Sequence, residues 1–455
     1  MPNAATLPDS EAAGHWTLVV RRAARLSIVA ALGALLAGCM LFRLHRDLKR
    51  IETYGWIEGQ ASAADPSLPL IVVLYSEPSV TPSIEPGLQI VDFFVLPRAG
   101  RYFFVAPAGT YRIAAFEDRN RDLTYQPGVE PAGYYGESRS PDVKTAPTGV
   151  VLDSGAHIRD VNVAIARESQ WKIPFAVGPL DPHKRAIPDL PDVHLGTVAE
   201  IDDARFSDEN GNLGLWQPAE FVFKVGAGVY FADKYDPDKI PVLFVHGAGG
   251  HPGNFKYLAA HLDRRRFQPW FAYYPSGVGL DAASRSLLRW LATLQVQYGF
   301  SKMVLVAHSM GGLVTAAAIN HAIEDPTATR LVRLPVFVTI STPWNGQASA
   351  ASGVERAPVV VPSWHDMAPG SPFLSSLVRP LPPECSHYLF FSYQGSTPFI
   401  REASDGVVAV ASELHLPIQR RAKRMLGFSE DHVSILRSSE VSTELNGILA
   451  EAAGS

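Results

Sequence analysis

Between residues 241 and 393, short apolar runs alternate with a helical pattern, and this alternation constrains the fold more than any other feature of the chain. The runs share strong apolar character and strand-like length, and they lie at residues 241–245, 270–274, 303–307, 336–340 and 388–393. Continuous apolar strands are expected in a parallel sheet that is covered on both faces. Residues 282–297 place Leu287, Leu291 and Leu294 on one side of a helix. The alternation therefore predicts a doubly wound, mostly parallel α/β sheet.

A small all-β domain is expected before this sheet, over residues 55–165. Short alternating or β-rich runs occur there at residues 70–75, 92–95, 101–105, 111–116 and 161–165. Strands at intervals of about ten residues, separated by Pro/Gly turns, indicate a β-sandwich.

The remaining segments are assigned by their lack of a clear pattern. Residues 166–217 have no sustained periodicity and are interpreted as a linker that packs against the next domain. Residues 221–231 are interpreted as a hairpin that opens a domain of residues 218–445, and residues 446–455 as a C-terminal tail.

Composition excludes several classes of protein. With 47% hydrophobic and 19% charged residues, the chain has enough apolar material for packed cores and too little charge for a disordered protein. A net charge of −5 argues against a nucleic-acid partner, which would require a basic surface. Two cysteines are too few for a disulfide scaffold. No apolar run of 18 or more residues follows residue 50, which excludes a multi-pass membrane protein.

The N-terminal residues carry a targeting pattern. Arg21, Arg22 and Arg25 precede an uncharged, mostly apolar stretch at residues 26–42, which is typical of a secretory signal. Inside that stretch, Leu-Ala-Gly-Cys at residues 36–39 resembles the bacterial lipobox, in which a signal peptidase cuts before a cysteine that becomes lipid-modified.

The lipobox resemblance implies a particular location. Residues 1–38 would be a signal peptide, Cys39 would carry the lipid, and residues 39–54 would be a tether. We therefore expect an exported lipoprotein of a bacterium, anchored on the periplasmic face of a membrane, most simply the outer membrane. The alternative is an uncleaved single membrane helix with an ordinary cysteine.

Two features of the β-rich region have functional interpretations. Residues 103–116, with Pro-Ala-Gly-Thr-Tyr at their centre, resemble the transthyretin-like accessory domains of exported enzymes, which bind or space rather than catalyse. Asp118, Asn120 and Asp122 alternate like calcium ligands, although Leu123 replaces the glycine of an EF-hand loop. The alternative for this weak calcium candidate is a solvated turn whose side chains bond to the backbone.

A serine stands where the third apolar run meets a helical pattern. Residues 307–311 read Ala-His-Ser-Met-Gly. A serine on a strained strand-to-helix turn needs small residues two positions before and after it, and Ala307 and Gly311 meet this need. The motif resembles the nucleophile elbow of α/β-hydrolases, with Ala307 in place of the commoner glycine. The resemblance implies that Ser309 is the nucleophile; the alternative is a tight turn without a catalytic role.

The first apolar run ends in His246-Gly247-Ala248, which resembles the His-Gly-x turn of lipases and esterases. This resemblance implies that the backbone amides of Ala248 and Met310 form an oxyanion hole. His246 itself is expected to be structural.

Later motifs supply an acid and a histidine in the order of this family. Residues 404–408 resemble the turn of lipases that presents the acid, which implies Asp405, and His432 precedes a helix-like segment. In the implied triad Ser309 attacks, His432 transfers the proton and Asp405 orients the imidazolium. Other residues remain open for the acid or base roles: Asp366, Asp431, His365, His387 and His415.

The segment after the fourth apolar run bears on the substrate. Residues 342–346 and 366–374 resemble segments of bacterial lipases and of lipase-like hydrolases related to lipid-remodelling deacylases. Between them, residues 348–364 are apolar and irregular, which fits a lid or the wall of an acyl pocket, or an ordinary packing insertion.

The sequence thus predicts a membrane-tethered serine hydrolase of carboxylic esters, acting on lipid or other acyl esters through an acyl-enzyme. This chemistry needs no metal ion and no organic cofactor. Acyl transfer or amide hydrolysis by the same triad is an alternative. A non-catalytic surface lipoprotein with a binding β-sandwich is another, and the intact set of Ser309, Asp405 and His432 argues against it.

Overall fold

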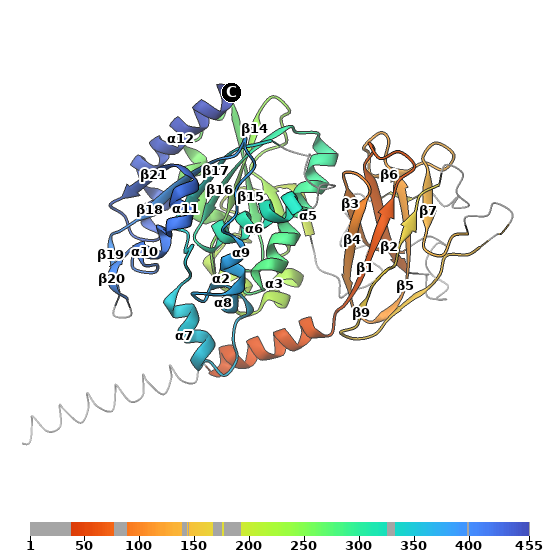
Figure 1. The fold of residues 1–455 in the computed structure, drawn as a ribbon, viewed down its shortest axis with the longest axis horizontal. Coiled ribbons are helices and arrows are strands. Elements are labelled where there is room, and N and C mark those ends of the chain that lie inside the picture. Colours follow the sequence, from red (N-terminus) through yellow and green to blue (C-terminus); the bar gives the residue numbers. More distant parts are fainter. Residues whose placement is uncertain are drawn as a thin grey trace, which may run out of the picture.

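The computed structural model describes residues 38–76, 89–138, 143, 145–166, 175–176, 193–324, 333–397 and 400–454. Figure 1 shows two bodies, an all-β domain (residues 55–166) and a larger α/β domain (residues 193–454), with the helical residues 38–52 running alongside. The latter are called the entry helix.

Two sheets face each other in the all-β domain. One has the order β10-β1-β4 with β9 beside β1, and the other has the order β3-β2-β5-β7 with β8 beside β5. The strands are β1 Gly55–Ser62, β2 Leu70–Ser76, β3 Gln89–Leu96, β4 Gly100–Ala106, β5 Gly109–Glu117, β7 Ala132–Tyr134, β8 Val150–Leu152, β9 His157–Ile158 and β10 Val163–Ala164. Their inward side chains, including Ile57, Phe104, Leu74 and Ile113, form one apolar core. The predicted all-β domain is confirmed.

A separate pair of short strands, β6 Thr124–Tyr125 and β11 Phe175–Ala176, joins the end of this domain to the chain that follows it.

The α/β domain is built on an eight-stranded sheet of order β12-β13-β15-β14-β16-β17-β18-β21. Its strands are β12 Val193–Val198, β13 Ala227–Phe231, β14 Ile240–Val245, β15 Phe267–Tyr273, β16 Lys302–His308, β17 Arg333–Ile340, β18 Ser386–Ser392 and β21 Ala422–Phe428. Pairing is parallel from β15 to β21, whereas β13 is antiparallel to β15. The predicted doubly wound, mostly parallel sheet is confirmed.

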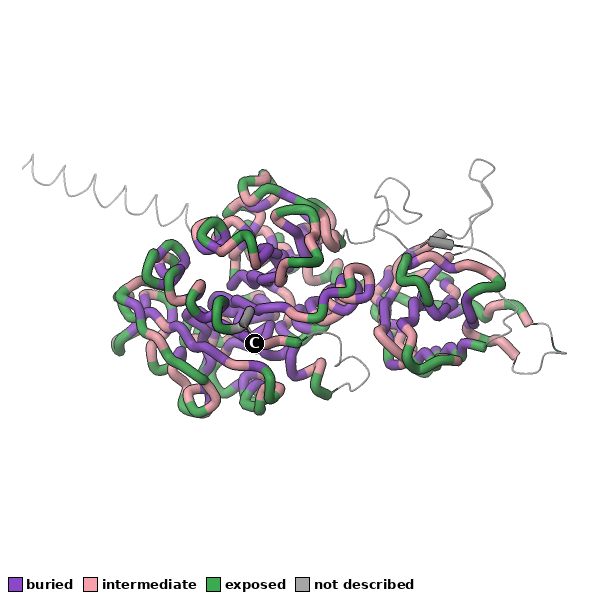
Figure 2. The backbone as a smooth tube through the Cα atoms, turned by 90° about the horizontal axis from the view of Figure 1, so that it is seen from above, coloured by how far each residue is buried: buried purple, intermediate pink, exposed green. Residues whose placement is uncertain are grey.

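Helices cover both faces of this sheet. On one face α5 (Leu280–Tyr298) and α6 (Met310–Glu324) share a core with Trp270 and Leu305. On the other face α4 (Lys256–Ala260) and α12 (Ser439–Gly454) pack against a second core. Because the central strands are buried between these layers, as the continuous purple segments in Figure 2 show, their sequences are apolar throughout.

Three expectations about the ends of this domain need correction. The expected hairpin at residues 221–231 is a helix, α3 (Pro218–Lys224), followed by β13. The expected linker contributes β12 and a helix, α2 (Asp208–Trp216). The expected tail belongs to α12, where Ile448 and Leu449 are fully buried. In each case tertiary packing decides the structure of a segment whose own periodicity is weak.

The entry helix is docked on the α/β domain, whereas the sequence analysis assigned its residues to a tether. Leu44 and Asp47 are buried, and the Asp47 carboxylate accepts hydrogen bonds from the amides of Ala219 (2.8 Å) and Glu220 (3.0 Å) at the start of α3. The Arg50 guanidinium lies 3.8 Å from the ring centre of Phe223. An aspartate at a helix N-terminus satisfies free amides and complements the helix dipole.

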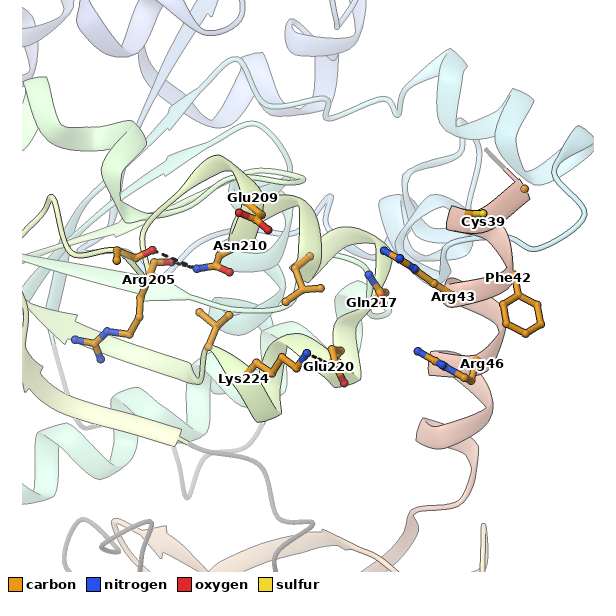
Figure 3. A pocket seen from close by; sticks show the side chains of 14 residues that line it. Cys39, Phe42, Arg43, Arg46, Arg205, Glu209, Asn210, Gln217, Glu220 and Lys224 are labelled. Atoms are coloured by element: carbon orange, nitrogen blue, oxygen red, sulfur yellow. Dashed lines mark hydrogen bonds and ion pairs between the residues drawn. The ribbon is translucent and has the colours of Figure 1, made fainter. Parts of the chain in front are cut away.

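An open groove of about 1140 Å³ lies between the entry helix and α2 and α3. Figure 3 shows Arg43 and Arg46 pointing across it towards Gln217 and Glu220, and Phe42 pointing away. Cys39 is exposed at the beginning of the entry helix, and residues 36 and 37 of the lipobox lie outside the described residues. Within the described ranges, no helix has the length and hydropathy needed to span a membrane.

The all-β domain contacts the α/β domain through α5. Val296 of α5 joins the apolar cluster on the outer face of the β2 sheet, which includes Val73 and Phe116. Arg289 of the same helix contacts Asp92 on β3, with 2.7 Å between Nη2 and Oδ1. Apolar and ionic contacts therefore both join the domains.

Candidate active site

Ser309 stands at the turn between β16 and α6, at the centre of the large sheet. Its φ of +53° is a left-handed backbone conformation that residues with a side chain rarely adopt. Its amide donates to the Ile340 carbonyl oxygen over 2.8 Å, which anchors the turn to the neighbouring strand. A Cβ at Gly311 would lie 2.4 Å from the Val245 carbonyl oxygen, so glycine is required where α6 approaches β14. Local strain here presents the serine hydroxyl.

His432 meets Ser309 from a loop that follows β21. Its Nε2 lies 3.0 Å from the Ser309 Oγ, and its Nδ1 lies 2.5 Å from Oδ2 of Asp405. The backbone of His432 is held on both sides, because its amide donates to the Asp405 carbonyl oxygen and its carbonyl accepts from Nε2 of His308. The structure thus brings together three residues that are 96 and 27 positions apart in sequence (405 − 309 and 432 − 405).

Asp405 lies in the turn after β20 (Ile400–Ser404) and is buried. Its Oδ1 accepts from the amides of Val407 (2.9 Å) and Val408 (2.7 Å), and its Oδ2 also accepts from the Ser392 hydroxyl (3.1 Å). Burial by itself raises the pKa of the Asp405 carboxyl. The hydrogen bond and charge of His432, together with the two amides, outweigh burial and hold this pKa below its usual range.

Ser309 and His432 are only 9% and 7% exposed, so their contact is largely shielded from water. In such a chain of hydrogen bonds the imidazole accepts the serine proton while the carboxylate stabilises the resulting imidazolium. The arrangement is competent for nucleophilic attack on an acyl carbon.

The two amides expected to stabilise an oxyanion flank this serine. Met310 begins α6, and Ala248 lies in the turn after β14. In the described part of the chain neither backbone amide has a hydrogen-bond acceptor, so both are available to a ligand. Gly247 is needed beside them, because a Cβ there would lie 2.8 Å from the Ser309 Cβ.

His246 has both ring nitrogens engaged away from the serine. Nδ1 donates to the Gly247 carbonyl oxygen over 2.8 Å, and Nε2 accepts from the Tyr274 amide over 3.3 Å. Burial lowers the pKa of His246 to about 3, so the ring is neutral. These contacts give it a structural role.

Of the five other residues considered for the acid and base, three are engaged elsewhere. Oδ2 of Asp366 accepts from the Leu280 amide at the start of α5. Asp431 accepts from the amides of Val433 and Ser434 in its own loop. Nε2 of His387 contacts the Thr339 hydroxyl, at 2.9 Å. His365 is exposed on α8 (Pro362–Met367), and His415 precedes α11 (Leu416–Arg421).

Sequence reasoning missed two polar residues beside Asp405, namely Ser392 at the end of β18 and Glu413 at the end of α10 (Val410–Glu413). Both are buried, and the Ser392 amide donates to Oε2 of Glu413 over 3.2 Å. The sequence did carry one signal for Glu413, because it is the single acidic residue in the mostly apolar run of residues 407–414, and such a residue is often buried with a partner.

Sequence reasoning also missed α2, which covers the glycine turn after β14. A Cβ at Gly211 would lie 2.3 Å from the Gly249 carbonyl oxygen, so the two backbones touch. Trp216 at the end of α2 meets Trp364 of α8 edge to face, with ring centres 5.6 Å apart. The segment of residues 348–364 is thus helical at both ends, as α7 (Ala348–Arg356) and the start of α8, and packs against α2.

The calcium candidate in the all-β domain uses its oxygens internally. The carboxylate of Asp118 accepts from the amides of Asp122 and Leu123, and Asp122 accepts from the Thr124 amide. Oδ1 of Asn120 also accepts from the Asp122 amide. No cluster of three or more His, Cys, Asp or Glu side chains suited to a metal ion occurs among the described residues.

Comparison with known proteins assigns the larger domain. Residues 242–434 match the Alpha/beta hydrolase family. No curated protein is similar enough to this chain to count as a match. Over this part of the chain the protein has the α/β-hydrolase fold, and an all-β domain precedes it.

Solved structures similar to the chain include lipases. The mature form of the lipase BlEst2 from Bacillus licheniformis is 18% identical at a TM-score of 0.38, over 49% of this chain and 97% of that one. The product of gene lin2722 from Listeria innocua is 17% identical at a TM-score of 0.35, over 47% and 94%. The phospholipase PlaB from Legionella pneumophila is 15% identical at a TM-score of 0.33, over 38% and 45%.

Proposed function

We propose that this protein is a serine hydrolase of carboxylic esters. The observation that carries the proposal is the continuous chain of hydrogen bonds from Ser309 Oγ through the His432 imidazole to the Asp405 carboxylate, with distances of 3.0 and 2.5 Å. The family match supports a hydrolase domain at the same residues.

The proposed reaction has two halves, acylation of Ser309 and hydrolysis of the acyl-enzyme, and the same groups act in both. Ser309 Oγ bonds to the acyl carbon as its proton passes to Nε2 of His432, and the amides of Ala248 and Met310 hold the oxyanion. The ester bond then breaks, and the leaving alcohol takes the proton from Nε2. Water attacks the acyl-enzyme, gives a proton to Nε2, and Ser309 regains it as the acid leaves.

Lipid or other acyl esters are the proposed substrates. Helices α2 and α8 meet at the aromatic pair Trp216 and Trp364, α7 packs on Trp364 at Gly353, and α2 also touches the glycine turn after β14. An apolar wall favours an acyl chain over a polar substituent.

Labelling with a fluorophosphonate probe tests the proposal. The wild type should label and Ser309→Ala should not, while Ser301→Ala, a substitution of an exposed serine before β16, should label normally. Activity on p-nitrophenyl esters should disappear with the label and should rise from acetate to octanoate. A wild type that neither labels nor hydrolyses any ester would leave the non-catalytic lipoprotein as the better interpretation.

We also propose that the chain is exported, lipidated at Cys39 and held at a membrane. The exposed position of Cys39 at the beginning of the entry helix supports this proposal. The all-β domain is proposed as a transthyretin-like spacer or binding module.

A further inference from the structure

A second carboxyl group lies next to the acid of the proposed triad. Glu413 is 1% exposed, and it shares a neighbour with Asp405: the Ser392 amide donates to Oε2 of Glu413 (3.2 Å), and the Ser392 hydroxyl donates to Oδ2 of Asp405 (3.1 Å). The Ser341 hydroxyl, which follows β17, lies 2.6 Å from the Ser392 hydroxyl. Two carboxyls and two hydroxyls thus form one buried cluster.

The two carboxyls have unequal sets of donors. Asp405 receives hydrogen bonds from His432, Ser392 and two amides. Oε2 of Glu413 receives one, from the Ser392 amide, and Oε1 receives none from any described group. Adjacent buried carboxyls do not both ionise, and the one with more donors takes the charge. The proton is therefore assigned to Glu413. It would sit on Oε1, the oxygen that receives no hydrogen bond, and from there it would be donated to a neighbouring acceptor.

We propose that Glu413 is a positioning residue that, as a neutral carboxylic acid, donates a hydrogen bond to Asp405 and holds that carboxylate in line with His432. The inference rests on the proposed function, because it concerns the acid of the same triad. It adds a fourth member, which acts through Asp405 and touches no substrate.

The electrostatics of the cluster agree with this assignment. Burial, followed by the charge of Asp405, raises the pKa of Glu413 to about 10. Asp405 is the charged group that faces it; the neighbours from β18 and from the end of β17 are Ser392 and Ser341, which carry no charge at neutral pH.

Two substitutions separate this role from plain packing. Glu413→Gln keeps a donor for Asp405 and an acceptor for Ser392. Its kcat/KM should therefore stay within about threefold of wild type, and the acid limb of its pH profile of kcat/KM should not move. Glu413→Leu fills similar space without either bond, so kcat/KM should fall by about tenfold or more, as expected for loss of a hydrogen bond to a charged group. With one donor fewer, Asp405 holds the protonated imidazole more strongly, and the acid limb should move up by about one pH unit.

The matched control is Glu117→Gln, which alters a fully buried glutamate of the all-β domain whose Oε1 accepts from the Asp65 amide. It should leave kcat/KM and the pH profile unchanged. Equal activity and equal profiles for wild type and Glu413→Leu would overturn the inference. So would a downward shift of the acid limb by a unit or more in Glu413→Gln, since that shift would mean that Glu413 is ionised.

Infrared spectroscopy of full-length protein at neutral pH keeps the test independent of whether Glu413→Leu folds. The difference spectrum between wild type and Glu413→Gln should contain a carbonyl band of a protonated carboxylic acid that belongs to wild type; a difference spectrum without that band contradicts the assignment. This measurement needs no turnover. Failure of serine-dependent labelling would therefore overturn the proposed function. Intact labelling, together with Glu413 variants whose activity, pH profile and infrared spectrum equal those of wild type, would overturn only the role of Glu413.

Discussion

At the scale of single residues, the site depends on groups held in states that they avoid in isolation. Ser309 has a positive φ, and Glu413 is a carboxyl group without solvent. Strain and burial of this kind cost stability, and they persist where surrounding contacts over-determine them. For Ser309 those contacts are the strand to one side and α6 to the other; for Glu413 they are Asp405 and the Ser392 amide.

The buried proton of Glu413 makes a prediction about stability and pH. Its pKa is about 10 in the folded protein and 4.5 as a free side chain, so between these values the unfolded chain gives up a proton that the folded one keeps. Folding stability attributed to this group therefore falls as pH rises, by at most about 1.4 kcal/mol per unit. Glu413→Gln lacks this loss, so its Tm relative to wild type should increase steadily from pH 5 to pH 9. A difference independent of pH would show that Glu413 is ionised in the folded state.

At the scale of elements, Ser309, the proposed nucleophile, is positioned by the close approach of α6 to β14. Gly311 allows that approach, and Gly312 allows contact with Thr342, where a Cβ would lie 2.1 Å from the hydroxyl oxygen. Parallel strands place the loops that carry Asp405 and His432 at the same edge of the sheet as Ser309. Loops at the carboxyl ends of strands are the usual sites in such sheets.

Two glycine substitutions should therefore have opposite effects. Gly311→Ala places a Cβ against the carbonyl oxygens of Val245 and His246, at 2.4 and 2.5 Å, and should destabilise the fold by about 1–3 kcal/mol and reduce probe labelling. Gly447→Ala, in the interior of α12 with open space around it, should stabilise by about 0.5–1 kcal/mol. Urea unfolding of both variants measures the difference. Equal stability of the two would contradict the tight contact at the elbow.

At the scale of the whole molecule, distant segments meet on the α/β domain. The entry helix docks on α3 through Asp47, and the all-β domain contacts α5 through Arg289 and its apolar neighbours. A lipid on Cys39 would consequently hold the α/β domain close to the membrane through a helix that is docked on it.

Substitution of the two cysteines tests the anchor. Cys39→Ser should move the protein from the membrane to the soluble fraction of a bacterial host and abolish incorporation of labelled palmitate. Cys385→Ser, which changes a buried thiol, should leave both unchanged. Cys39→Ser that remains in the membrane, with its full N-terminal length, would favour the uncleaved membrane helix.

The sequence was informative wherever structure is decided locally. The apolar strands and the small residues around Ser309 were readable because each reflects a short-range requirement of packing or turn geometry, whereas Asp405 and His432 were implied by the resemblance to α/β-hydrolases. The structure then brings those three side chains together.

Tertiary structure alone decided the rest. Asp47 caps a helix 172 positions away, α2 covers the glycine turn from a segment without periodicity, and Glu413 keeps a proton because of Asp405 and burial. A helix cap, a backbone contact and a shifted pKa between distant residues depend on which groups folding brings together. Local pattern carries no information about that, because hydrogen-bond partners and solvent exposure are properties of the packed molecule.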